Sequence, residues 1–184
     1  MRRIVVGDTA TGRGRVLSDD SVDPLTLALL PGAEIYRMWE LDEPPVLPVD
    51  GLPRPTATHF FPGPGGLRFG IISVPPGLSY EPDTDLSEEE TAAAAAEAEA
   101  KVPGMMAAFD PAAPGMHRTA TVDFIAVLSG QGRLRLGDGT DVSLRPGNCV
   151  IQNGTPHAWF NDGTVPFVFY YSLCGTDPGT PTNS

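Results

Sequence analysis

The chain has 184 residues, 41% of them hydrophobic, which is enough for one domain with a full core and too short for two comfortable ones. Its 23 acidic and 12 basic side chains give a net charge of -11, which disfavours binding to nucleic acid phosphates or anionic lipid headgroups. No apolar run reaches the length of a signal peptide or a bilayer span, so we expect a cytoplasmic protein without nucleic acid or membrane partners. The 21 glycines and 20 prolines indicate many turns and a mostly β fold.

Residues 1–55 are predicted to form an N-terminal β extension that ends in a proline-rich loop. Residues 3–6 and 14–17 are expected to pair as a hairpin, and residues 34–41 to form a further strand, because these runs are apolar and bounded by turn residues. Five prolines between residues 42 and 55 cannot enter a sheet ladder and therefore indicate a loop.

Residues 56–175 are expected to form the main β-barrel, interrupted by a helical insertion over residues 78–114. The barrel begins with a predicted hairpin of residues 56–61 and 67–74, which are separated by a Pro- and Gly-rich turn. Residues 176–184 are polar, and we expect a flexible tail there.

A helix is predicted over residues 87–101, within the insertion. Ser87 and Glu90 have the spacing of a capping box, and the residues that follow are mostly alanine. Two roles are open for this helix and the apolar residues at 105–109. They either pack onto the sheet or form a lid over the mouth of the barrel.

The second half of the chain is predicted to be a run of antiparallel hairpins. Residues 121–128, 132–136, 140–144 and 149–152 have strand-like composition, and glycine-bearing turns separate them. Residues 167–171 are rich in Phe and Tyr and give the final strand.

Two histidines flank these hairpins. His117, Thr119 and Asp123 share parity and would point to one side of a strand. At about 3.3 Å per residue, a straight strand would hold His117 and Asp123 about 20 Å apart, so the chain must bend or bulge after Thr119 if both bind one ion. His157 and Trp159 also share a face, and a closed barrel would bring His117, Asp123 and His157 together.

The spacing after the first histidine resembles the first motif of the cupin family. His117 is followed by one residue and Thr119, then by three residues and Asp123, and then by six residues and Gly130. The family has a second histidine where this chain has Thr119 and a glutamate where it has Asp123. Both departures bear on metal binding.

The second cupin motif is matched by residues 147–161. Gly147 and Gly154 precede His157, and Asn161 follows after three residues. The interval between the two glycines is one residue shorter than the usual form. The resemblance covers approximately residues 56–173, apart from the helical insertion.

The resemblance implies an all-β fold, an antiparallel cupin barrel of the jelly-roll or double-stranded β-helix type. It also implies that His117, Asp123 and His157 hold one divalent metal ion and act as the catalytic residues. Two histidines and one carboxylate suit Fe, Zn or Mn, and Thr119 would leave a coordination position open to water or substrate. Loss of the metal is the alternative.

The resemblance further implies a metal-dependent enzyme of secondary metabolism that acts on a small oxygenated acid or polyketide-like compound. Lewis-acid lyase or cyclase chemistry, such as dehydration, decarboxylation, isomerisation or ring closure, is the first expectation. A non-haem Fe(II) dioxygenase and a non-catalytic ligand-binding cupin are the alternatives. The candidate substrate-pocket residues are Thr119, Gln152, Trp159 and Phe124. Family dimers often form through N-terminal strands, so residues 1–41 are expected to support a homodimer.

Overall fold

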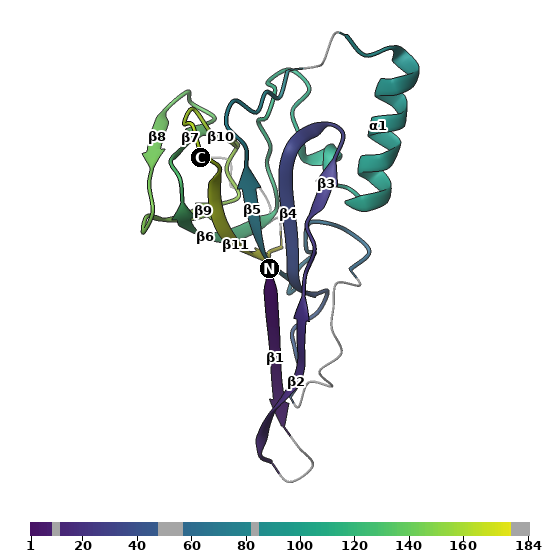
Figure 1. Cartoon of the computed structure of the whole chain (residues 1–184), viewed down its shortest axis with the longest axis vertical. Helices are drawn as coiled ribbons and strands as arrows, with labels where there is room; N and C mark the ends of the chain where they lie inside the picture. Colours follow the sequence, from purple (N-terminus) through teal and green to yellow (C-terminus); the bar gives the residue numbers. More distant parts are fainter. Residues whose placement is uncertain (9–11, 48–56, 82–84, 178–184) are drawn as a thin grey trace.

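The computed structural model describes residues 1–8, 12–47, 57–81 and 85–177. Within them, antiparallel strands form three sheets beside one α-helix, α1 (Glu88–Lys101) (Figure 1). The strands are β1 (Arg2–Asp8), β2 (Gly14–Ser21), β3 (Leu25–Leu27), β4 (Leu30–Leu41), β5 (Leu67–Val74), β6 (Thr121–Ser129), β7 (Gly132–Leu136), β8 (Asp141–Leu144), β9 (Cys149–Asn153), β10 (His157–Phe160) and β11 (Phe167–Gly175). The predicted all-β jelly-roll class, with an N-terminal strand extension and one inserted helix, is confirmed.

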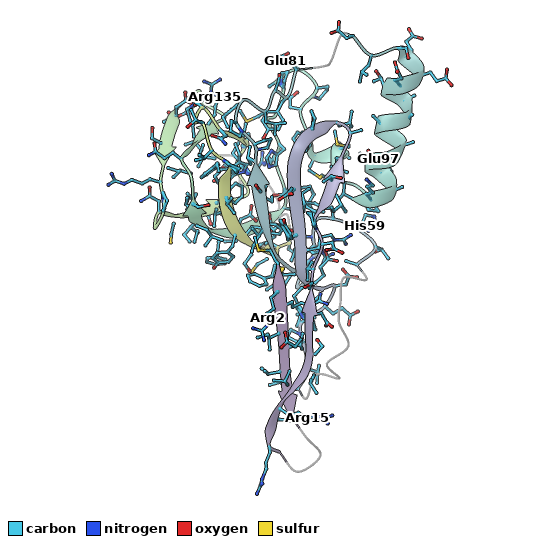
Figure 2. The ribbon with its side chains drawn as sticks, viewed as in Figure 1. Arg2, Arg15, His59, Glu81, Glu97 and Arg135 are labelled. Atoms are coloured by element: carbon cyan, nitrogen blue, oxygen red, sulfur yellow. The ribbon has the colours of Figure 1, made fainter. Side chains whose placement is uncertain are left out.

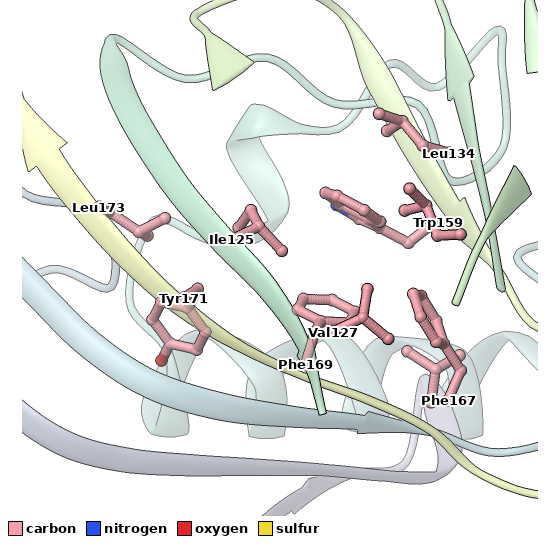
Figure 3. Close-up of a cluster of buried hydrophobic side chains, with 10 residues drawn as sticks. Ile125, Val127, Leu134, Trp159, Phe167, Phe169, Tyr171 and Leu173 are labelled. Carbon is pink, nitrogen blue, oxygen red and sulfur yellow. The ribbon is translucent and has the colours of Figure 1, made fainter. Parts of the chain in front are cut away.

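A six-stranded and a three-stranded sheet form the body of the fold. The larger sheet has the order β3-β4-β5-β11-β6-β9, and the smaller one has the order β10-β7-β8. Buried side chains from both sheets make one apolar core, in which β6 and β11 supply Ile125 and Phe169 while β7 and β10 supply Leu134 and Trp159 (Figure 3). Burying this alternate set of side chains fixes the strand register, since a one-residue slip would turn each of them to the other face.

The predicted hairpin of residues 56–61 with 67–74 is wrong. Residues 57–61 are bends or coil, and β5 pairs with β4 on one side and β11 on the other. The carbonyls of His59 and Phe60 accept hydrogen bonds from the guanidinium of the buried Arg68, at 3.0 and 3.2 Å. A side chain therefore satisfies backbone groups that would have paired in the predicted sheet ladder.

The predicted helix is confirmed, with its capping box. The Ser87 hydroxyl accepts a hydrogen bond from the Glu90 amide at 3.2 Å, and a Glu90 carboxylate oxygen accepts one from the Ser87 amide at 2.9 Å. Ala98 and Val102 pack with Leu27 of β3 in a second apolar cluster. The helix thus lies against the β3–β4 edge of the large sheet.

The N-terminal strands separate into two groups. β1 and β2 form a two-stranded sheet of their own and project away from the body (Figure 1). β3 and β4 instead extend the large sheet. The domain boundary at residue 55 stays a prediction, and most of the predicted tail, residues 178–184, lies outside the described residues.

Across the described segments, no helix has both the length and the apolar character needed to cross a bilayer.

Candidate functional site

His117 and His157 face each other at one end of the core. Their backbones form a reciprocal antiparallel pair, because the His117 amide donates to the His157 carbonyl at 2.9 Å and the His157 amide donates to the His117 carbonyl at 3.0 Å. Side chains of such a pair project from the same face. The imidazole centroids are accordingly 4.2 Å apart.

Both imidazoles are oriented by backbone carbonyls. Nδ1 of His117 lies 3.1 Å from the Gly115 carbonyl oxygen, and Nδ1 of His157 lies 2.9 Å from that of Thr155. A carbonyl only accepts, so each Nδ1 carries the proton and each Nε2 keeps its lone pair. Burial lowers the pKa of His157, and burial together with the neighbouring His157 lowers the pKa of His117 to about 4. Both rings are therefore neutral at pH 7 and can act as ligands.

Asp123 is a buried carboxylate with an unsatisfied oxygen. It lies on β6 with 4% of its surface exposed, and its Oδ1 has no hydrogen-bond partner among the described residues. Burial raises the pKa of Asp123 to about 6, against a smaller lowering by a hydrogen bond from Thr121. An unpaired buried carboxylate is costly, so the site favours a cation or a proton near this oxygen.

These groups line one cavity of about 100 Å³. Its walls are predominantly apolar, and its polar side chains include His117, Thr119, Asp123 and His157. The other lining residues are Leu30, Ala33, Ile35, Phe60, Phe61, Ile72, Val74, Leu78, Tyr80, Met105, Phe109, Ile125, Trp159, Phe169, Tyr171 and Leu173. A concave, mostly apolar site with a few convergent polar groups is typical of small-molecule binding.

Comparison with known proteins identifies this part of the chain. Residues 105–174, which contain the two histidines and Asp123, match the family model described as a cupin domain, Cupin_2. The chain contains a cupin domain.

Two fungal proteins match part of this chain. Oryzines biosynthesis cluster protein J of Aspergillus oryzae is 37% identical over 54 residues, and the cupin-domain-containing oxidoreductase fogC of Aspergillus ruber is 34% identical over 61 residues. Each match covers 29% of this chain and only 30% of the relative. Among solved structures, the cupin domain of Schizosaccharomyces pombe Cnp3 is similar with a TM-score of 0.48 and 11% identity, covering 96% of this chain and 88% of that one.

The donor set of the cupin cavity fits a divalent ion in its chemistry. Two neutral imidazoles keep Nε2 lone pairs, and no described residue hydrogen-bonds to the buried Oδ1 of Asp123. The described residues nevertheless contain no group of three or more His, Cys, Asp or Glu side chains already placed to hold a metal. The histidine pair is preformed, whereas Asp123 lines the same cavity without joining a three-ligand cluster.

The expected break in the strand after His117 is present. Residues 118–120 are not in a strand, Ala120 is a bend, and β6 starts at Thr121. His117 can therefore pair with β10 while Asp123 points into the same cavity from the large sheet.

Two of the four predicted substrate-pocket residues line the cupin cavity, namely Thr119 and Trp159. Phe124 is a correction, because it alternates with Asp123 on β6, faces away from the core and is 42% exposed. Gln152 is buried on β9 outside the cavity lining, and its amide donates to the Thr155 carbonyl and hydroxyl at 3.0 and 2.8 Å. It supports the turn whose carbonyl orients His157.

The insertion contributes cavity residues that were not among the predicted substrate-pocket residues. Leu78 and Tyr80 line the cavity before α1, and Met105 and Phe109 line it after the helix, whereas α1 itself does not. The Phe109 ring lies 4.9 Å from that of His117. The segments flanking the helix therefore cover the cavity while the helix packs on the sheet. A sequence signal existed only for 105–109, the apolar run just before the first motif.

Gly115 is a further residue of the site that the sequence analysis did not predict. Its carbonyl orients His117, its φ is +80°, and a Cβ there would lie 2.5 Å from the Tyr80 ring. Glycine is needed both for the left-handed backbone and for this close contact.

We expect Gly115→Ala to weaken metal binding by about 10- to 100-fold, the usual cost of disturbing a group that orients a ligand. The measurement is titration of chelator-treated protein with Zn²⁺. The matched control is Gly139→Ala, since Gly139 has a φ of +86° but open space around its Cβ position. Equal effects of the two substitutions would show that backbone strain alone is responsible.

Proposed function

We propose that this chain is a metal-dependent cupin enzyme acting on a small oxygenated acid or polyketide-like compound by lyase or cyclase chemistry. One observation carries the proposal. Two imidazoles with Nδ1 fixed to carbonyls lie in contact inside an apolar cavity that also holds a buried carboxylate oxygen without a partner.

His117 and His157 would hold a Zn, Fe or Mn ion through their Nε2 atoms, and Asp123 would supply the third ligand. The carboxylate gains most from the cation, because its charge is buried and Oδ1 is unsatisfied. Thr119 lines the cavity, but its hydroxyl is 2.7 Å from that of Thr121, so this hydroxyl pair occupies part of its hydrogen-bonding capacity. A bound ion would supply Lewis-acid polarisation of a substrate carbonyl.

The remaining side chains would bind and shield the substrate. Phe109 stacks against His117 and Trp159 packs edge-on against His157, so aromatic walls flank the polar end. The Tyr80 hydroxyl donates to the Trp159 carbonyl at 2.7 Å, which ties the insertion to β10. Burial raises the pKa of Tyr80 to about 12, so its phenol stays protonated at neutral pH. Exclusion of water strengthens the electrostatic interactions that act on a reacting carbonyl.

The names of the relatives support a biosynthetic role, and one of them also supports an oxidative reaction as the alternative. One is named as a biosynthesis cluster protein, which favours a secondary-metabolite substrate, and the other is named as an oxidoreductase. The second name favours the non-haem Fe(II) dioxygenase alternative, which the same two-histidine, one-carboxylate set can support. A metal-free, non-catalytic binding protein is the third candidate.

Metal analysis and oxygen uptake separate these candidates. We expect protein purified without chelators or an affinity-column metal to contain about one divalent ion per chain, in keeping with a single three-ligand site. Oxygen uptake by iron-loaded protein with a candidate substrate would select the dioxygenase, whereas turnover without oxygen would select the lyase. Protein that neither contains nor takes up metal would overturn the metal-dependent proposal.

We also propose that the predicted homodimer forms through the β1–β2 hairpin. One face of this hairpin exposes Ile4, Val6 and Val16 at 51%, 69% and 58% (Figure 2 labels Arg2 and Arg15 on the same hairpin). The hairpin, residues 2–21, holds four arginines and three aspartates, which leaves 8 basic and 20 acidic side chains in the rest of the chain. A hairpin with an exposed apolar face and a small net positive charge is complementary to a second copy of this acidic protein.

We expect the double substitution Val6→Asp and Val16→Asp to convert a dimer into a monomer, because it places two charges in the apolar face of the proposed interface. Sedimentation equilibrium measures the change. Val165→Asp, at a residue 56% exposed elsewhere, is the control and should remain dimeric. A monomeric wild-type protein at micromolar concentration would contradict the hairpin interface.

A further inference from the structure

We infer that the substrate of this cavity carries one compact oxygen-bearing head group on an otherwise uncharged, apolar body. This inference rests on the proposed function and narrows it. It excludes substrates with a second anionic group, such as dicarboxylates and sugar phosphates, and favours the polyketide-like half of the proposed substrate range.

The chemically active groups lie toward one side of the cavity. Asp123 comes from β6, His157 from β10, and His117 with Thr119 from the segment between the insertion and β6. The reciprocal backbone pairing of His117 with His157 keeps this end together. The head group of a bound compound is therefore directed to this end.

The opposite walls are hydrocarbon. In the large sheet, β11, β5 and β4 follow β6 in that order. At about 4.8 Å per strand, β4 is about 14 Å from β6. β4 and β5 contribute Leu30, Ala33, Ile35, Ile72 and Val74 to the lining. A body extending from the head group across the sheet thus meets only aliphatic side chains on these strands.

No lysine or arginine is among the described residues that line the cavity. A second carboxylate or a phosphate at the far end would be buried with no cationic side chain in the described lining to pair with it, which is unfavourable. The other polar lining atoms are those of Tyr80, Trp159 and Tyr171, and the Tyr80 hydroxyl is already bonded to the Trp159 carbonyl. None of these three can neutralise an anion at neutral pH, although a phenol or indole among them can donate a hydrogen bond to a neutral polar group.

A matched set of hydroxamates tests the preference of the cavity for an uncharged, apolar tail. Hexanohydroxamic acid, adipic acid monohydroxamate and acetohydroxamic acid share a metal-binding head but differ in the tail. With zinc-loaded protein, we expect hexanohydroxamic acid to bind at least about 10-fold more tightly than either of the others, because its tail is long and uncharged. Quenching of tryptophan fluorescence reports binding, since Trp159 lines the cavity. Equal affinity for the carboxylated compound would overturn the inference.

A lysine in the apolar wall formed by β4 and β5 should make the cavity favour a ligand with a charged tail. Leu30 is half-buried on β4, so a lysine there can keep its charge near the surface. We expect Leu30→Lys to strengthen binding of adipic acid monohydroxamate by at least about 10-fold, while the control Val165→Lys leaves it unchanged. Folded Leu30→Lys protein with unchanged affinity would contradict the assignment of Leu30 to the tail end.

Ligand binding to metal-free protein distinguishes failure of this inference from failure of the proposed function. Hexan-2-one and 5-oxohexanoate differ only by a terminal methyl or carboxylate group, and neither needs a metal for the comparison. A preference for hexan-2-one in protein that takes up no metal would support the apolar-body inference and sink the proposed metal chemistry. Metal uptake with equal binding of the two compounds would support the metal site and overturn the inference.

Discussion

Replacing His157 by alanine is expected to abolish metal content and activity together. His157 is buried, its Nδ1 is held by the Thr155 carbonyl, and its ring contacts that of His117. Removing it deletes one of the two imidazoles proposed as metal ligands. We expect the metal affinity to fall by more than about 100-fold, since loss of a group that merely orients a ligand already costs about 10- to 100-fold.

The measurement is zinc or iron content after dialysis, with circular dichroism to establish that the variant is folded. His157→Gln preserves more of the side-chain volume and should give the same loss if coordination, and not packing, is responsible. His59→Ala is the matched control, because His59 is exposed outside this cavity. Full metal occupancy in His157→Ala would remove His157 from the site.

Replacing Asp123 by asparagine is expected to stabilise the metal-free protein while eliminating its stabilisation by metal. The wild-type carboxylate is buried with Oδ1 unsatisfied, and its pKa is raised to about 6 by that burial. A shift of about two units corresponds to a penalty of about 3 kcal/mol for the charged form at neutral pH. Asparagine keeps the shape and removes the charge, so the melting temperature of the metal-free variant should rise by several degrees.

The contribution of Asp123 to the stability of the metal-free protein decreases as the pH rises. Because the folded-state pKa of Asp123 is raised above its unfolded value of 3.8, the wild-type protein is fully stabilised by this group below that value and loses the contribution as the pH rises to about 6. The advantage of Asp123→Asn should therefore appear between about pH 4 and 6 and stay constant above. Thermal melts of metal-free protein measure it, with the exposed Asp23→Asn as control.

Two results would contradict the assignment of Asp123. A metal-free Asp123→Asn protein less stable than wild type at pH 7.5 would mean that the carboxylate makes a favourable contact in the fold. Undiminished metal affinity in the variant would mean that the two imidazoles hold the ion without the carboxylate.

Local sequence patterns were sufficient for the strands and the helix of the second half. The Ser87–Glu90 capping box and the alternation of buried and exposed residues in β6 depend only on residues that are close together in the sequence. Both features can therefore be predicted from the sequence. The same alternation also separates Asp123 from Phe124, and applying it would have placed Phe124 outside the cavity. That error came from reading aromatic character without strand parity.

The partners of β5 could not be read in the same way. The 56–61 segment precedes β5 at a hairpin distance, whereas its actual partner β4 ends at Leu41, far earlier in the chain. The guanidinium of Arg68 instead bonds the carbonyls of His59 and Phe60. Hydrogen bonding by a buried side chain depends on which segments meet after folding. The lining of the cavity by Tyr80 and Phe109 likewise results from packing of the insertion.

The sequence by itself determined the β class, the capped helix and the two histidine-bearing motifs, because each depends on residue type and short spacing. Only the tertiary structure decided that His117 and His157 pair directly across their backbones, that Gly115 and Thr155 orient their rings, and that the opposite walls of the cavity are aliphatic. The physical reason is that strand pairing joins residues forty positions apart through backbone hydrogen bonds, which any residue type can make.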